Sequence, residues 1–213
     1  MKDIDLRNKI IATVLKFDKT GLSEGTSGNL STRTGDGFLI TPSGIDYEKL
    51  IPEDLVEMDL TGRIISCKLK PSSEWPFHKA IYATREEVNA VMHVHSPYAT
   101  GIACSRRDIP AFHYMVALAG GDNIRCAEYA TFGSEELSTY AVNALQDRKA
   151  CLLANHGQIA LGEDIAEAFN LAREVENLAR LFWISLQAGG PVLLDDREME
   201  INLEKFKTYG KQG

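Results

Sequence analysis

Apolar residues in the first part of the chain recur at helical spacing. Leu6, Ile10, Val14 and Phe17 fall on one face of a helix, and Gly21 is placed to end it. Serine and aspartate side chains accept hydrogen bonds from the free N–H groups of a first helical turn, and proline is tolerated there. Further helices are therefore predicted to begin at Ser72-Ser73, at Ser96-Pro97, at Ser134 (to about Leu145) and after Asp164, which forms a capping arrangement with Glu167 (Ile165 to about Gln187).

Between these helices the apolar runs are short, and turn residues separate them. Three pairs of runs are predicted to form hairpins, and one further run forms a strand. Together they predict an α/β fold in which residues 1–213 form a single domain with a largely antiparallel central sheet flanked by helices. The hairpins are 29–33 with 37–41 around Thr34-Gly-Asp-Gly, 54–59 with 63–66 around Leu60-Thr-Gly62, and 150–154 with 158–161 around His156-Gly157, and the further strand is 89–95.

Composition and charge exclude several classes of partner. The 213 residues carry a formal net charge of -7, and a polyanion such as nucleic acid or an acidic membrane surface requires a basic face. No apolar run is long enough to cross a membrane, and the mixed charges at the start fit neither a signal nor a transit peptide, so the expected location is the cytoplasm. Four cysteines stand far apart and are predicted to be buried, reduced thiols: Cys67, Cys104, Cys126 and Cys151.

His93 and His95 are two residues apart on a predicted strand. Their side chains therefore point to the same face, with Cα atoms ~6–7 Å apart. At that separation two imidazoles can converge on one zinc ion, for which Zn–N distances are ~2.1 Å. The pair is equally compatible with two solvent-facing histidines on a half-exposed strand.

His156 and Glu74 are the other candidates for such a site. His156 comes at a strand end before Gly157, and can be either a hydrogen-bonded turn residue or a ligand. Glu74 is expected in the first turn of a helix, where a carboxylate also complements the helix dipole. Trp75 and Phe77 beside it suggest an apolar wall that would raise its pKa and suit proton transfer. His78, four residues after Glu74, and His113 have roles that stay open.

Three short segments are rich in glycine and hydroxyl side chains. They are Gly25-Thr-Ser-Gly28-Asn29, Thr41-Pro-Ser43-Gly44, and Ser72-Ser73 at a helix start. Hydroxyls, amides and free backbone N–H groups can surround a phosphate without any lysine. Each segment alone is also compatible with an ordinary turn.

Taken together, these segments resemble the class II aldolase and epimerase family. The similarity covers the whole chain and is strongest to the branch that acts on fuculose phosphate. It rests on SGNLS (27–31), LITPSGIDYEKL (39–50), KPSSEWPFH (70–78), HVHSPYAT (93–100), IPAFHYM (109–115), CAEYATFGSEEL (126–137), NHG (155–157) and LEKFKTYG (203–210).

The resemblance implies a site for each part of the substrate. It implies one Zn²⁺ per subunit, held by Glu74, His93, His95 and His156. It implies that a sugar phosphate is bound through Gly28, Asn29, Ser43, Gly44, Ser72 and Ser73. Tyr114 of a neighbouring subunit and Tyr209 would handle the aldehyde, Phe132 and Phe206 would line its pocket, and the active sites would lie between subunits of a homotetramer.

The implied activity is reversible cleavage of L-fuculose 1-phosphate to dihydroxyacetone phosphate and L-lactaldehyde. Glu74 would be the base, and an enediolate would be stabilised on the metal. Glu74 favours this branch, because the ribulose-phosphate 4-epimerase branch carries aspartate after its serine pair. The alternatives are that epimerase, a rhamnulose-phosphate aldolase, a methylthioribulose-phosphate dehydratase, or a non-catalytic adducin-like module.

Overall fold

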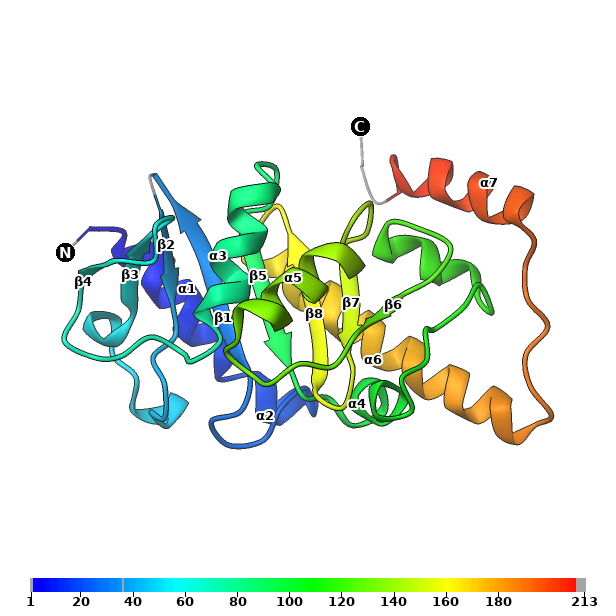
Figure 1. The fold of residues 1–213 in the computed structure, drawn as a ribbon, viewed down its shortest axis with the longest axis horizontal. Coiled ribbons are helices and arrows are strands. Elements are labelled where there is room, and N and C mark those ends of the chain that lie inside the picture. The colour runs from blue at the N-terminus through cyan, green and yellow to red at the C-terminus, as the bar shows by residue number, and fades with distance from the viewer. Residues whose placement is uncertain (1, 36, 210–213) are drawn as a thin grey trace.

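The computed structural model describes residues 2–35 and 37–209, and its centre is one eight-stranded sheet (Figure 1). The strand order is β4-β3-β2-β1-β5-β8-β7-β6, and every neighbouring pair is antiparallel except β6 with β7. The predicted α/β fold with a largely antiparallel sheet is therefore confirmed. The strands are β1 (Asn29–Thr34), β2 (Gly37–Ile40), β3 (Val56–Asp59), β4 (Ile64–Ser66), β5 (Ala90–Val94), β6 (Arg125–Ala127), β7 (Ala150–Leu153) and β8 (Gly157–Gly162).

Helices cover both faces of the sheet. Helices α3 (Trp75–Thr84) and α5 (Glu135–Ala144) pack against each other on one face, and α1 (Ile4–Val14), α4 (Pro97–Cys104) and the long α6 (Ile165–Gln187) lie on the other (Figure 1). Helix α7 (Asp196–Phe206) packs against the 3₁₀ helix η3 (Tyr114–Ala119). The remaining short elements are α2 (Phe17–Thr20), η1 (Tyr47–Lys49) and η2 (Pro52–Asp54).

Side chains of the central strand β5 alternate between the two layers. Ala90, Met92 and Val94 belong to the core under α1 and α6, whereas Val91 belongs to the core under α3 and α5. Because successive strand residues point to opposite faces, His93 points with Val91 towards α3. No helix in residues 2–35 and 37–209 is long and apolar enough to cross a membrane.

Most of the predicted boundaries are confirmed. The opening helical segment divides into α1 and α2 and ends at Gly21, whose φ of 68° is the left-handed conformation that suits glycine. Ser96 is the N-cap of α4 with Pro97 next to it. The Ser134 side chain accepts from Leu137 N–H, and Asp164 accepts from Glu167 N–H at the start of α6. The three hairpins pair as predicted, although Asp36 lies outside the described residues.

Three predictions need correction or extension. Helix α3 does not begin at Ser72-Ser73: Glu74 is its N-cap, with φ –97° and ψ 8°, and the helix starts at Trp75. The cysteines are all free, but Cys104 is exposed and only Cys151 is fully buried. Strand β6 and helix α7 were not predicted, because three residues are too few to show alternation and α7 buries only Met199 and Asn202.

Candidate metal centre and adjoining pocket

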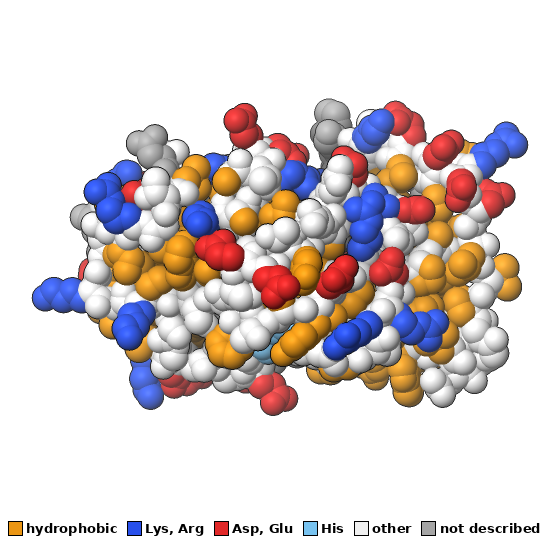
Figure 2. Space-filling view, viewed as in Figure 1, with side chains coloured by type: hydrophobic (Ala, Val, Ile, Leu, Met, Phe, Trp, Pro, Cys, Tyr) orange, Lys and Arg blue, Asp and Glu red, His pale blue; other side chains and the backbone are white. Residues whose placement is uncertain are grey.

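Four side chains from three parts of the fold converge at one end of β5. Glu74, His93, His95 and His156 each offer one ligand atom, and these atoms all lie within 4.8 Å of one another. Glu74 comes from the start of α3, His95 follows the end of β5, and His156 lies in the β7–β8 turn. Glu74 and His93 are buried, whereas His95 and His156 are half-buried, and a small patch of histidine surface is visible in the space-filling view (Figure 2). The structure thus brings together all four residues for which a metal role was predicted.

Hydrogen bonding leaves the inward nitrogen of His93 free to act as a ligand. His93 Nδ1 lies 2.9 Å from the Gln158 carbonyl oxygen, to which it can only donate. In the neutral ring Nε2 then carries a lone pair, and it lies 2.9 Å from Nε2 of His95. Backbone carbonyls orient many metal-binding histidines in this way.

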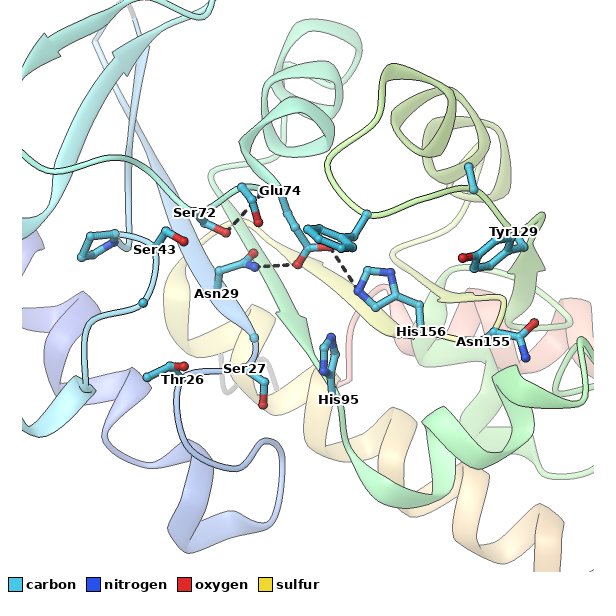
Figure 3. Close-up of a pocket in the computed structure, with 16 residues that line it drawn as sticks. Thr26, Ser27, Asn29, Ser43, Ser72, Glu74, His95, Tyr129, Asn155 and His156 are labelled. Atoms are coloured by element: carbon cyan, nitrogen blue, oxygen red, sulfur yellow. Dashed lines mark hydrogen bonds and ion pairs between the residues drawn. The ribbon is translucent and has the colours of Figure 1, made fainter.

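The Glu74 carboxylate is surrounded by nitrogen atoms rather than by an apolar wall. Its Oε2 accepts from Asn29 Nδ2 at 3.0 Å, and its Oε1 lies 3.1 Å from His156 Nε2 (Figure 3). Oε2 also lies 3.1 Å from His93 Nε2. Burial by itself raises the pKa of Glu74, but protonated His93 and His156 imidazoles lower it by more, so the net direction in the metal-free protein is downward. The predicted rise is therefore wrong, because the neighbours on the sheet outweigh Trp75 and Phe77 beside it in the sequence.

His95 stays uncharged near neutral pH. Burial lowers the pKa of His95 to about 4, and the neighbouring His93 and His156 rings lower it in the same direction. A neutral imidazole is the form that binds a metal ion. The surroundings of His95 thus disfavour its protonated form, which could not bind a metal ion.

The donor set fits a divalent metal ion, and the chemistry suits zinc. Glu74 Oε1 is buried and accepts no hydrogen bond from any group in residues 2–35 and 37–209. Three imidazole nitrogens and a carboxylate oxygen, all of which carry lone pairs, lie close together. A cation at their centre would offset the repulsion between these lone pairs. Histidine nitrogen and carboxylate oxygen are common zinc ligands. A metal site at this cluster is therefore consistent with the geometry, and the identity of the metal stays a prediction.

A pocket of about 360 Å³ opens beside the cluster (Figure 3). Small polar residues lie on one side of the histidines, and Tyr129 and Asn155 lie on the other. The segment carrying Ser43 is tied to the one carrying Ser72 by two backbone hydrogen bonds, Ser43 N–H to Lys70 O and Ser72 N–H to Thr41 O. All six residues predicted to bind phosphate line this pocket: Gly28, Asn29, Ser43, Gly44, Ser72 and Ser73.

The aromatic residues predicted to contact the aldehyde fall into two groups. Phe132 lines the pocket and is 66% exposed. Tyr114, Phe206 and Tyr209 instead lie together where α7 packs on η3: the Tyr114 and Phe206 rings stack at 6.3 Å, and Phe206 meets Tyr209 edge-on at 5.3 Å. None of these three lines the pocket of its own chain. The structure therefore does not bring them to the metal cluster within one subunit.

Some residues near the site were not singled out from the sequence. Thr26, Ser27, Tyr129 and Asn155 also line the pocket. Thr26 and Ser27 lie inside the predicted glycine-rich segment, and Asn155 precedes His156. Their positions beside predicted site residues were therefore the feature of the sequence that could have identified them. His113, whose role was open, accepts from Met115 N–H at 3.2 Å at the start of η3.

Comparison with known proteins agrees with this geometry. Residues 8–183 match the family described as Class II Aldolase and Adducin N-terminal domain. A solved structure of L-fuculose 1-phosphate aldolase superposes with a TM-score of 0.94 at 42% identity, covering 97% of this chain and 98% of that one.

Two curated relatives carry different substrate names. The chain is 53% identical over 207 residues to the 5-methylthioribulose-1-phosphate/5-deoxyribulose-1-phosphate aldolase of Rhodospirillum rubrum, covering 97% of this chain and 93% of that protein. It is 50% identical over 206 residues to the L-fuculose phosphate aldolase of Escherichia coli, covering 96% and 95%. Both are aldolases, and they differ in the sugar that their names give.

Proposed function

This chain is an enzyme of the class II aldolase family, and we propose that it reversibly cleaves L-fuculose 1-phosphate to dihydroxyacetone phosphate and L-lactaldehyde with the help of zinc. One observation carries this proposal. Four metal-ligand atoms within 4.8 Å of one another adjoin a pocket lined by small hydrogen-bond donors. Such a pocket suits a phosphate held at a fixed distance from the reacting carbons.

The residues divide between binding and proton transfer. The phosphate is bound by the backbone and side chains of the glycine- and serine-rich segments, including Ser43 and Ser72. Held by His93, His95 and His156, zinc would supply a Lewis acid that polarises the substrate carbonyl and leave the Glu74 carboxylate free for proton transfer. Glu74 moves the proton at C3, the carbon next to that carbonyl.

The chemical step needs a second proton carrier. In the cleavage direction the C4 hydroxyl loses its proton as the C3–C4 bond breaks, and the electron pair left on C3 takes a proton that Glu74 has drawn from solvent. Tyr114 of a neighbouring subunit accepts the C4 hydroxyl proton while its phenol passes its own proton to solvent. Condensation is the reverse, and neither direction consumes a redox equivalent.

We propose that the site is completed by a second copy of the chain in a homotetramer. The support is that Tyr114, Phe206 and Tyr209 form one aromatic group outside the pocket of their own subunit. Placed against a neighbour's pocket, this group meets Phe132 and encloses the aldehyde end. Light scattering that gave the mass of one chain would contradict this assembly. The cytoplasmic location stays a prediction.

A second substrate has specific support. The relative at 53% identity is named for 5-methylthioribulose 1-phosphate and 5-deoxyribulose 1-phosphate. Both share C1 to C3 and the phosphate with fuculose phosphate, so the same phosphate pocket and metal centre serve them. Cleavage of the C3–C4 bond again releases dihydroxyacetone phosphate and changes only the aldehyde.

The experiment is cleavage of each ketose 1-phosphate by the purified protein, with identification of both products. We expect dihydroxyacetone phosphate and an aldehyde to appear, to disappear after chelation, and to return with Zn²⁺. The ratio of kcat/KM for L-fuculose 1-phosphate and 5-methylthioribulose 1-phosphate decides between the two substrates. A C4-epimerised sugar or a dehydrated product would instead assign the epimerase or the dehydratase reaction, and activity that survives chelation would contradict the metal role.

A further inference from the structure

A line of buried polar side chains runs from Glu74 into the protein between α3 and β1. Glu74, the N-cap of α3, is followed at intervals of four residues by His78 and Tyr82 within the helix, and Asn29 and Ser31 are two apart on β1. Four residues of helix rise ~6 Å and two residues of strand ~6.6 Å, so the side chains on α3 and those on β1 are spaced at nearly equal intervals. The side chains therefore alternate from helix to strand along the line.

Each neighbouring pair in the line is within hydrogen-bond distance. Glu74 Oε2 lies 3.0 Å from Asn29 Nδ2, and Asn29 Oδ1 lies 2.5 Å from His78 Nε2. On the other side of the ring, His78 Nδ1 lies 2.6 Å from Ser31 Oγ, which lies 2.8 Å from the Tyr82 hydroxyl. The line is continuous from the carboxylate to the phenol.

The carboxylate at one end decides the direction of every hydrogen bond. An ionised Glu74 can only accept, so the Asn29 amide must present its nitrogen to Glu74 and its oxygen to His78. His78 must then donate from Nε2, which leaves Nδ1 to accept the Ser31 hydroxyl proton. Ser31 in turn accepts from Tyr82. All donors point towards Glu74.

Burial removes water as a substitute partner for these groups. The exposed fractions are 6% for Glu74, 3% for Asn29, 0% for Ser31 and His78, and 1% for Tyr82. Burial lowers the pKa of His78 to about 3 and raises the pKa of Tyr82. Both groups are neutral near pH ~7, as the directed line requires.

We infer that His78 is a positioning residue, which holds the Asn29 amide with one N–H on Glu74 and the second N–H towards the substrate pocket. Asn29 lines that pocket and also faces Glu74, so its orientation affects both the metal ligand and the substrate. A reversed amide would set its oxygen against the carboxylate and withdraw both N–H groups. This inference rests on the proposed metal site, but not on the identity of the sugar.

Two variants that differ by one methylene test this role. In His78→Gln the amide nitrogen can reach the place of Nε2 and still donate to Asn29. In His78→Asn the shorter side chain reaches only the place of Nδ1, so it keeps Ser31 and loses Asn29. Zinc affinity is measured by competition with a chelator, and thermal melting of the metal-free proteins controls for folding.

We expect His78→Gln to bind zinc within about threefold of the wild type and His78→Asn to bind at least ~10-fold more weakly, since outer-sphere partners affect metal affinity by that order. Equal losses in both variants would overturn the inference. Because zinc affinity needs no substrate, this result is separate from whether the proposed sugar is cleaved.

A measurement on the wild-type protein covers the case in which a variant does not fold. The chain has five histidines, so ¹⁵N labelling of histidine alone resolves their rings. We expect His78 to be neutral, with its proton on Nε2 and none on Nδ1. A proton on Nδ1 alone would mean that the line runs the other way, and it would overturn the inference.

Discussion

Gly157 lies so close to His95 that a β-carbon on the glycine would stand 2.8 Å from the imidazole Cδ2. The same β-carbon would lie 2.6 Å from the Val94 carbonyl oxygen and 3.2 Å from His93 Cε1. Real side chains do not approach this closely, so only glycine allows β8 to begin beside the end of β5. The histidine cluster depends on this close approach.

Replacing Gly157 with alanine should therefore damage both the fold and the metal centre. The extra methyl group must push back a backbone carbonyl and two imidazoles, which costs about 1–3 kcal/mol in the free energy of unfolding. We expect a lower urea midpoint and weaker zinc binding. A methyl group added at Gly101 in α4 would meet no atom within 4 Å, so Gly101→Ala is the control and should stabilise the protein slightly. Normal zinc affinity in Gly157→Ala would contradict this account of the turn.

The Glu74→Gln change should separate metal binding from proton transfer. Three histidines remain to hold the ion, but the amide cannot accept the C3 proton, so turnover should fall by at least ~100-fold. The measurements are zinc content and the exchange of the C3 proton of dihydroxyacetone phosphate with D₂O. Glu135→Gln, at an exposed position in the first turn of α5, is the control. A near-normal rate in Glu74→Gln would exclude Glu74 as the base.

Tyr114→Phe should slow carbon–carbon bond cleavage more than it slows C3 proton exchange. The phenol acts on the C4 oxygen, which takes no part in the exchange reaction of dihydroxyacetone phosphate alone. Comparing the two rates in one preparation provides the measurement. Equal losses in both would mean that Tyr114 has a structural role.

Mixing two variants that are each impaired in cleavage tests the shared site directly. If Tyr114 serves a neighbour, then tetramers assembled from Glu74→Gln and Tyr114→Phe chains contain some sites with both native residues. We expect such mixtures, refolded together, to recover part of the wild-type rate. Recovery should be absent when the two variants are mixed without subunit exchange, and its absence in both cases would place the two residues in one chain's site.

The metal-free protein should lose stability in mild acid partly through His78. Its pKa in the folded state is lowered to about 3, below the value of 6.5 for an unperturbed histidine. As pH falls below about 6.5, the unfolded chain binds a proton that the folded chain does not, so this contribution to stability decreases steadily towards pH ~3. Between pH ~6.5 and ~5, wild type should lose about 2 kcal/mol more than His78→Gln, measured by urea unfolding. Parallel pH profiles would show that His78 does not remain neutral.

The elements that local chemistry specifies were predictable from the sequence. Ser134 and Asp164 cap helices because their side chains reach amides three residues away, and Gly21 ends a helix because its φ is left-handed. Turn residues between short apolar runs predicted the hairpins for the same reason. His93 and His95 share a face by strand geometry alone, because side chains two residues apart on a strand point to the same side of the sheet.

Tertiary structure decided how the predicted residues act on one another. Asn29 pairs across the sheet with His93 although more than sixty residues separate them, and this register places its amide beside Glu74. The apolar neighbours of Glu74 in sequence suggested a raised pKa, but the histidines that surround it in space lower the value. Sequence identifies which groups a site can use, whereas distance and burial set their charge and hydrogen-bond direction, and these depend on contacts that only the folded chain makes.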